Sequence, residues 1–299
     1  MLWGGSGMAG QDARDYQIIF LCSFLSLGVI ARDWVLSPVA IAAILLTCLA
    51  VQILLTLGKQ GTGLRLFSGQ TWQQVWQDQG WKSALITGLG LCLLLRANHL
   101  STLVLAATLA IASKFLFKIR GKHWFNPANF GIIGALTLTG DAWVSPGQWG
   151  TGIWLAAVFL GAGGLILGKV GRWDTSVMFL AMYGGLDLLR NLWLGWPPSL
   201  TVYHLQNGSL LVFALFMLTD PRSIPNARPS RLIWATAIAV LTWVLQVYFY
   251  LPTAMFWALF LISPLTILLD WEIPAPRFQW INSLTKNTVK LTTKEVTYD

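Results

Sequence analysis

The sequence predicts an all-α, polytopic membrane protein with about ten transmembrane helices, arranged as two inverted five-helix repeats. Apolar residues make up 55% of the 299 residues and charged residues only 11%, whereas an ordinary soluble domain is about 25% charged. The apolar residues gather in long runs, and lysines and arginines stand at the ends of those runs. Basic residues in such positions orient membrane helices, so the net charge of +8 does not indicate a nucleic-acid partner.

Ten apolar runs come close to the ~20 residues that a membrane helix needs. The expected spans are residues 17–31, 36–58, 83–96, 100–117, 129–140, 150–168, 174–190, 208–219, 231–249 and 252–270. Two of them, 129–140 and 208–219, are too short to cross a bilayer alone, so we expect them to be broken or enclosed by protein. Residues 1–16 are then an N-terminal segment, residues 17–271 the transmembrane domain and residues 272–299 a polar tail.

The basic residues set the orientation of these spans. If the N-terminus is placed in the cytoplasm and the spans alternate, seventeen of the twenty lysines and arginines fall on the cytoplasmic side, and only Arg32, Arg96 and Arg190 fall outside. Cytoplasmic loops carry such an excess of positive charge. We therefore expect a multi-pass protein of the bacterial inner membrane, surrounded by lipid, with both termini in the cytoplasm.

Ten spans divide into five and five, and an odd number in each half forces the halves into opposite orientations, as in many transporters. The third and eighth spans are short, and each runs into polar residues. Short or interrupted segments at matching positions in two halves indicate a central binding site. We expect that site where the two spans end, at Arg96, Asn98, His99, Thr219, Asp220 and Arg222.

Other polar residues allow two interpretations. Asp220 either caps the end of the eighth span through the Asp-Pro turn, or binds a cation or the edge of a flavin. Asp187 and Arg190 stand one helical turn apart and form either an ion pair or a relay. Lys114 is expected to reach the cytoplasmic surface with its long side chain.

The glycines of the sixth span include a Gly-xxx-Gly pair, Gly164 and Gly168. Pairs of this kind allow two membrane helices to approach closely, so we expect a helix contact there. Histidines, cysteines and carboxylates show no metal-ligand spacing, and no motif of a catalytic nucleophile or a phosphate loop is present. We therefore predict no metal site and no catalytic residue.

Two basic hinges join the apolar runs, residues 114–131 (the first hinge) and residues 218–229 (the second hinge). Residues 121–131, Gly-Lys-His-Trp-Phe-Asn-Pro-Ala-Asn-Phe-Gly, and residues 216–221, Phe-Met-Leu-Thr-Asp-Pro, carry their motifs. In sequence and order these motifs resemble those of a bacterial membrane family. That family contains one membrane subunit of the sodium-translocating NADH:quinone reductase and one of the Rnf electron-transport complex. The segment 12–17 and the Asn126-Pro127-Ala128 form of the first motif are most similar to stand-alone members of that family.

The resemblance implies a ten-helix inverted repeat, quinone reduction coupled to ion movement, and FMN esterified to the threonine of a Ser-Gly-Ala-Thr motif after the first hinge. This sequence departs from that pattern. Residues 137–142 read Thr-Leu-Thr-Gly-Asp-Ala, and the most similar string, Ser68-Gly-Gln-Thr71, precedes the hinge. We therefore do not expect covalent FMN at Thr71 or Thr139, and the cofactor implied by the resemblance is a non-covalent flavin (FMN or riboflavin) or a quinone.

Three functions follow as hypotheses. The first is transmembrane transport or electron transfer together with other membrane subunits of a redox complex. The second is a stand-alone permease for a small solute such as a flavin, and the third is a membrane assembly or interaction protein without a substrate. The predicted cofactor-binding residues are Asn126, Thr219, Asp220 and Arg222, and the predicted substrate or ion pathway comprises Arg96, Asn98, His99, Asp187 and Arg190.

Overall fold

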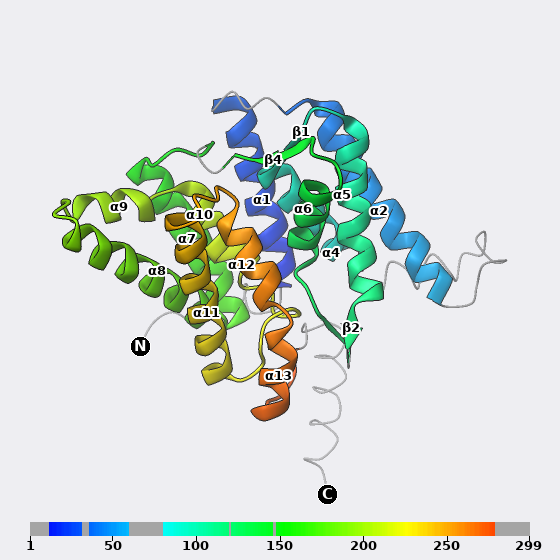
Figure 1. The fold of residues 1–299 in the computed structure, drawn as a ribbon. Helices are drawn as coiled ribbons and strands as arrows, with labels where there is room; N and C mark the ends of the chain where they lie inside the picture. Colours follow the sequence, from blue (N-terminus) through cyan, green and yellow to red (C-terminus); the bar gives the residue numbers. More distant parts are fainter. Residues whose placement is uncertain (1–11, 32–35, 60–79, 120, 146–147, 279–299) are drawn as a thin grey trace, which may run out of the picture.

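The computed structural model describes residues 12–31, 36–59, 80–119, 121–145 and 148–278, and helices dominate these parts (Figure 1). The helices before residue 140 are α1 (Ala13–Ala31), α2 (Pro38–Lys59), α4 (Gly80–Leu94), α5 (Leu100–Leu116) and α6 (Pro127–Leu138). Those after it are α7 (Ile153–Val170), α8 (Trp173–Trp193), α9 (Ser199–Leu205), α10 (Gly208–Val212), the π-helix η1 (Phe213–Met217), α11 (Arg228–Val247), α12 (Ala254–Ile262) and α13 (Leu265–Glu272). Each of the ten predicted spans coincides with one of these helices or with a consecutive pair, and the all-α prediction is confirmed.

The number of membrane crossings is smaller by the criterion of length and hydropathy. Within the described residues, four helices are long and apolar enough to cross a membrane, namely α1, α2, α7 and α11. The count rises to six if each bent pair is one span. These pairs are α9 with α10 and η1, bent by 55°, and α12 with α13, bent by 44°. The shorter helices α4, α5 and α6 are apolar too.

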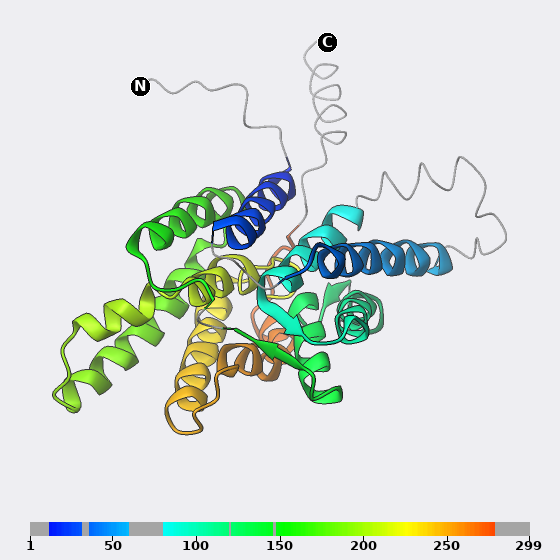
Figure 2. The ribbon, with the colours of Figure 1, turned by 90° about the horizontal axis from the view of Figure 1, so that it is seen from above.

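The helices of the two halves pack in the same order. In the first half α4 contacts α1 and α2, α2 contacts α5, and α5 contacts α6. In the second half α10 and η1 contact α7, η1 contacts α8, α8 contacts α11, and α11 contacts α12. The halves meet where α1 lies beside α7, as seen from above in Figure 2, and where α6 contacts α12.

Two short antiparallel ladders mark opposite ends of the helical bundle (Figure 1). Strands β1 (Leu95–Ala97) and β4 (Ala142–Val144) pair at one end, which we call the β1–β4 end. Strands β2 (Lys118–Ile119) and β3 (Lys122–His123) pair within the first hinge at the other end, which we call the hinge end. Gly121 has a φ of +79° in the turn between β2 and β3, a conformation that glycine adopts without strain.

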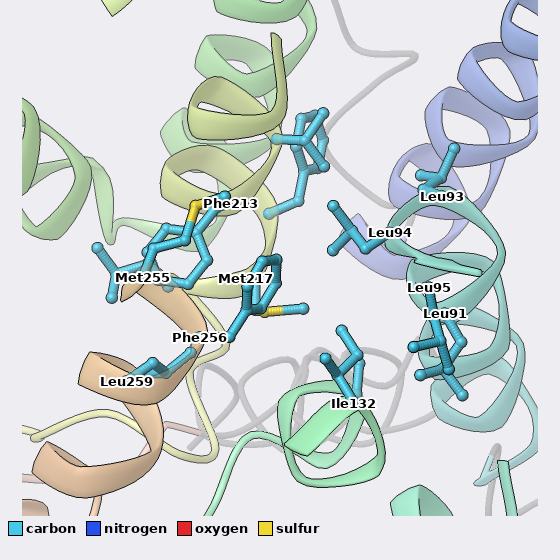
Figure 3. Close-up of a cluster of buried hydrophobic side chains, with 14 of the residues drawn as sticks. Leu91, Leu93, Leu94, Leu95, Ile132, Phe213, Met217, Met255, Phe256 and Leu259 are labelled. Atoms are coloured by element: carbon cyan, nitrogen blue, oxygen red, sulfur yellow. The ribbon is translucent and has the colours of Figure 1, made fainter. Parts of the chain in front are cut away.

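The buried core lies between the third helix of each half. Figure 3 shows Leu94 of α4 facing Met217 of η1, with Ile132 of α6 and Phe256 of α12 completing the cluster. Outside this core the bundle exposes many large apolar side chains, as lipid contact requires.

Glycines bring some helices of the bundle together. A Cβ at Gly131 of α6 would lie only 2.5 Å from the carbonyl oxygen of Ala106 in α5, so only glycine permits this approach. The expected contact at Gly164 and Gly168 is wrong for the described residues, because a Cβ at either glycine would meet nothing within 4 Å. It is their neighbour Gly163 that packs closely, against Leu215 of η1.

Candidate functional site: a cavity at the junction of the two hinges

The two hinges, about ninety residues apart in the sequence, are hydrogen-bonded to each other. The backbone N–H of His123 donates to the carbonyl of Arg222 (3.1 Å). Asn126 Nδ2 donates to the carbonyl of Met217 (3.0 Å), the last residue of η1. A carbonyl at the end of a helix has no partner within the helix, so Asn126 supplies one from the other half of the chain.

The same Asn126 side chain starts α6. Its Oδ1 accepts a hydrogen bond from the backbone N–H of Asn129 (3.1 Å), and Pro127 occupies the first turn. Asparagine is a favoured N-cap, and proline suits the first helical position because its missing N–H would have no partner there. The Asn-Pro-Ala motif therefore begins one helix and fixes the end of another.

A cavity of about 450 Å³ opens beside this junction, lined by residues of both halves. Its volume lies in the range of small-molecule sites, roughly 300–1,000 Å³. Apolar residues from α4, α7, α10 and η1 form much of its wall, among them Leu93, Leu94, Ile166, Val212 and Phe216. Polar residues of the hinge end also line it, among them Arg14, Lys114, His123, Asn126, Asp220 and Arg222.

Lys114 belongs to this cavity and not to the surface. Its side chain is buried, and Nζ donates to the carbonyl and to the hydroxyl of Ser83 in α4, both at 3.1 Å. The prediction that Lys114 reaches the cytoplasmic surface is therefore wrong. Lys114 sits in the last turn of α5, before the chain continues into β2, so its side chain is enclosed by α4 and the second hinge.

His123 is buried beside these cations. Burial lowers the pKa of His123 to about 3, and the nearby charges of Lys114, Arg222 and Lys118 contribute to this lowering. The ring is therefore neutral at physiological pH. Among the described residues nothing hydrogen-bonds its Nδ1, and Gln52 Oε1, on another residue lining the cavity, also lacks a partner. Buried polar atoms normally have partners, so both point to a bound molecule or to water.

Asp220 shapes the turn of the second hinge, as the structural interpretation of the Asp-Pro sequence predicts. Its Oδ1 accepts from the backbone N–H of Arg222 (3.1 Å), and its Oδ2 accepts from the hydroxyl of Ser223 (3.2 Å). The hydroxyl of Thr219 donates back to the carbonyl of Leu215 (2.7 Å). The four residues predicted to bind a cofactor, Asn126, Thr219, Asp220 and Arg222, all line this one cavity.

The structure does not bring Arg96, Asn98 and His99 to that cavity. They lie at the β1–β4 end, about 21 Å from the hinge end if α4 rises 1.5 Å per residue over its fifteen residues. In an inverted arrangement the third and eighth spans run in opposite directions, so their final residues cannot meet. The expectation of one site at both span ends is corrected on this ground.

Arg96 has partners of its own at the β1–β4 end. Its side chain is buried, and its guanidinium donates to the backbone carbonyls of Cys92 and Leu95, both at 2.7 Å. It also donates to Oε1 of Gln148 at 2.9 Å. The guanidinium therefore ties the end of α4 to the segment that follows β4.

Asn98 and His99 are held at the same end by the carboxylate of Asp141. This carboxylate accepts hydrogen bonds from Nδ2 of Asn98 and from the backbone N–H of His99, both at 3.1 Å. It also accepts from the hydroxyl of Thr102 at 2.7 Å. These bonds, that of Thr102 first, hold the pKa of Asp141 below its usual range. Asn98 and His99 thus fix the loop between β1 and α5.

Asp187 and Arg190 do not pair with each other in the described structure. Asp187 is buried, accepts from Asn191 Nδ2 and lies 3.1 Å from His204 Nδ1 of α9. Arg190 lies over the ring of Trp196, 5.1 Å from its centroid. The helical spacing allowed an ion pair, but α9 and the loop before it provide other partners.

The two threonines considered for covalent flavin are placed differently. Thr71 lies outside the described residues, as do parts of both predicted terminal segments. Thr139 is half-buried near the β1–β4 end, where its hydroxyl donates to the carbonyl of Ala135 (2.7 Å), and it does not line the cavity.

Sequence reasoning missed Gln52, Thr56 and Ser83 as cavity residues. A signal for two of them was present, because Gln52 and Thr56 are polar, four residues apart and thus on one face of an apolar span. Polar residues within a membrane span commonly mark a functional site. Ser83 stands near the start of α4, where a serine carries no such signal.

Comparison with known proteins agrees with the motifs. Residues 135–278, which include the second hinge, match the model of the "NQR2, RnfD, RnfE family". The chain belongs to the NQR2, RnfD, RnfE family. With its apolar helices, this member of the family is a multi-pass membrane protein.

Curated relatives of this NQR2, RnfD, RnfE family member are named as subunits of an ion-translocating oxidoreductase complex. The protein from Escherichia fergusonii is 30% identical over 141 residues, 46% of this chain and 36% of the relative. That from Halorhodospira halophila is 32% identical over 146 residues, 47% of this chain and 38% of the relative. That from Stutzerimonas stutzeri is 31% identical over 119 residues, 40% and 31% of the two chains. The chain thus spans about a third of the length of these relatives.

Proposed function

We propose that this protein serves transmembrane transport or electron transfer, and that it holds a non-covalent flavin (FMN or riboflavin) or a quinone in the cavity between the hinges. The observation that carries the proposal is the cavity itself, which lies where the two sequence motifs meet and is lined by both halves. The name of the relatives, subunits of an ion-translocating oxidoreductase complex, supports the reaction class.

The residues present suit such a ligand. Apolar side chains such as Leu94 and Phe216 offer a wall for an aromatic ring, and the polar atoms His123 Nδ1 and Gln52 Oε1 lack partners among the described residues. A bound flavin or quinone would supply the electron-accepting chemistry. The chain itself would bind and orient the ring, and the walls would exclude water from it.

The membrane arrangement in this proposal is ten crossings in two inverted repeats. The equivalent order of helix pairs in the two halves supports it. So do the contacts between halves, because a two-fold axis would place the first helices α1 and α7 together and the fifth helices α6 and α12 together. The positive-inside rule then places the hinge end and both termini in the cytoplasm of a bacterial inner membrane.

The partners in this proposal are membrane lipid and other membrane subunits of a redox complex, with which the exposed apolar helices would make contact. A stand-alone permease for a small solute such as a flavin is the second candidate. It is favoured by the position of the cavity between the two halves, since transporters with inverted repeats bind their substrates there.

The absorption and fluorescence spectrum of the purified protein, before and after acid precipitation, tests the proposal. We expect a flavin spectrum whose colour moves into the supernatant, because the flavin is not held by a covalent bond. Colour that stays with the precipitate would contradict the non-covalent assignment. A colourless protein that also binds no added FMN, riboflavin or quinone would contradict the proposed function.

A further inference from the structure

We infer that the hinge end of the cavity is an anion site, in which Lys114 and Arg222 hold the phosphate or carboxylate of an amphipathic ligand whose apolar body lies along α4 and η1. This inference rests on the proposed function of the cavity and adds the chemical class of its ligand. It excludes neutral quinones and neutral flavins as the preferred occupants.

The first observation is that two cations lining the cavity have no counter-ion in the described chain. Lys114 is 5% exposed, and its Nζ is bonded only to the two neutral oxygen atoms of Ser83. In the part of the chain that the structure describes, the guanidinium of Arg222 forms no ion pair or hydrogen bond, although its backbone N–H is bonded to Asp220. Buried lysines are almost always paired.

The second observation is that the neighbouring charges are already matched. Asp220, the carboxylate of the second hinge, accepts from the Arg222 N–H and from Ser223, both within its own turn. Arg14, which also lines the cavity, is paired with Asp12 at 2.6 Å. The chain therefore leaves positive charge at one end of the cavity, and an anion from a ligand would compensate it.

The third observation gives the rest of the ligand. His123, 7% exposed, and Gln52, 9% exposed, line the same cavity and carry polar atoms without a partner in the described chain. Because His123 is neutral, it adds no charge but can hydrogen-bond an uncharged polar group. A ligand with an anionic group, further hydrogen-bonding groups and an apolar ring satisfies all of these residues.

FMN and riboflavin form a matched pair of probes, because they differ only in a terminal phosphate. Binding of each to the full chain in detergent is measured by flavin fluorescence, with decylubiquinone as a neutral competitor. We expect FMN to bind at least about tenfold more tightly than riboflavin, as hydrogen bonds to charged groups imply. Raised salt should reduce this preference, and inorganic phosphate should compete with FMN but not with riboflavin.

The outcomes separate the two proposals. Equal binding of the two flavins, or displacement of neither by phosphate while the quinone binds, would overturn the anion site and leave the proposed function intact. Failure of FMN, riboflavin and decylubiquinone alike to bind would overturn both.

Substitutions assign the preference to the residues. Arg222→Gln should remove most of the preference for FMN and leave riboflavin binding unchanged, which also reports that the cavity is folded. Lys114→Gln should do the same where it folds. Arg228→Gln is the matched control, because Arg228 lies at the same end of the bundle, is exposed and does not line the cavity. An undiminished preference in Arg222→Gln would contradict the assignment.

Discussion

At the scale of single residues, Asn126 does two tasks that a sequence motif cannot separate. The Asn-Pro-Ala order predicts a turn and a helix start, and the structure has both. The bond from Asn126 Nδ2 to Met217, ninety-one residues away, could not be predicted, because it depends on how the two halves pack. This bond makes Asn126 the link between the hinges.

Substitution of Asn126 tests that link. Asn126→Ala should destabilise the protein by about 1 kcal/mol for the lost helix cap, and by about 1–3 kcal/mol more for the Met217 carbonyl left without a donor. Asn126→Asp keeps the acceptor for the cap but has no donor for Met217, so it should lose only the second part. Thermal unfolding in detergent measures both, and an unchanged midpoint in Asn126→Ala would show that the link is unimportant.

His123 should make stability depend on pH. Burial lowers its pKa to about 3 in the folded protein, whereas an exposed histidine has a pKa of about 6.5. Between these values the unfolded chain binds the proton, so this stability is fully present above about pH 6.5 and is lost as the pH falls toward about 3. Unfolding midpoints measured at about pH 7.5 and about pH 5 should therefore differ less in His123→Gln than in the unchanged protein; equal differences would refute the neutral buried ring.

At the scale of helices, apolar runs predicted position well and packing poorly. The runs found each helical segment because hydropathy reflects burial in lipid or in protein. The Gly164–Gly168 pair did not mark a contact, since spacing alone does not tell which face of a helix meets a neighbour. Gly131, with no such pairing in the sequence, makes the close approach instead.

Two alanine substitutions test this difference. Gly131→Ala places a Cβ 2.5 Å from the carbonyl oxygen of Ala106 and should destabilise the protein by about 1–3 kcal/mol. Gly164→Ala meets open space and should be neutral or stabilise by up to about 1 kcal/mol, because alanine is the better helix former. Thermal midpoints measured side by side would expose the opposite order, which would place the helix contact at Gly164.

A buried ion pair joins α8 to α11. Arg231 contacts both carboxylate oxygens of Asp174, the shortest distance being 2.6 Å, and both side chains are buried. Arg231→Met would leave a buried carboxylate unpaired and should cost about 3–5 kcal/mol. The exposed Arg228, 3.8 Å from the same carboxylate, should cost about 0–1 kcal/mol when changed to glutamine. Chemical unfolding of the two variants compares these costs, and similar values would count against a desolvated pair.

At the scale of the whole molecule, the sequence led to the right family and the right hinges but to a divided site. The two motifs meet in space, and the four predicted cofactor residues line one cavity. Arg96, Asn98 and His99 lie at the far end, because inverted halves send equivalent helices in opposite directions. The cavity residues Gln52 and Lys114 needed the fold, since only packing shows which polar side chains of a span face inward.

The most direct test of the central claim is a cryo-electron microscopy map of the protein with FMN added. Our account predicts density for the flavin in the cavity between the hinges, with its phosphate beside Lys114 and Arg222 and its ring between α4 and η1. Flavin density elsewhere on the molecule, with this cavity holding only water, would contradict the account.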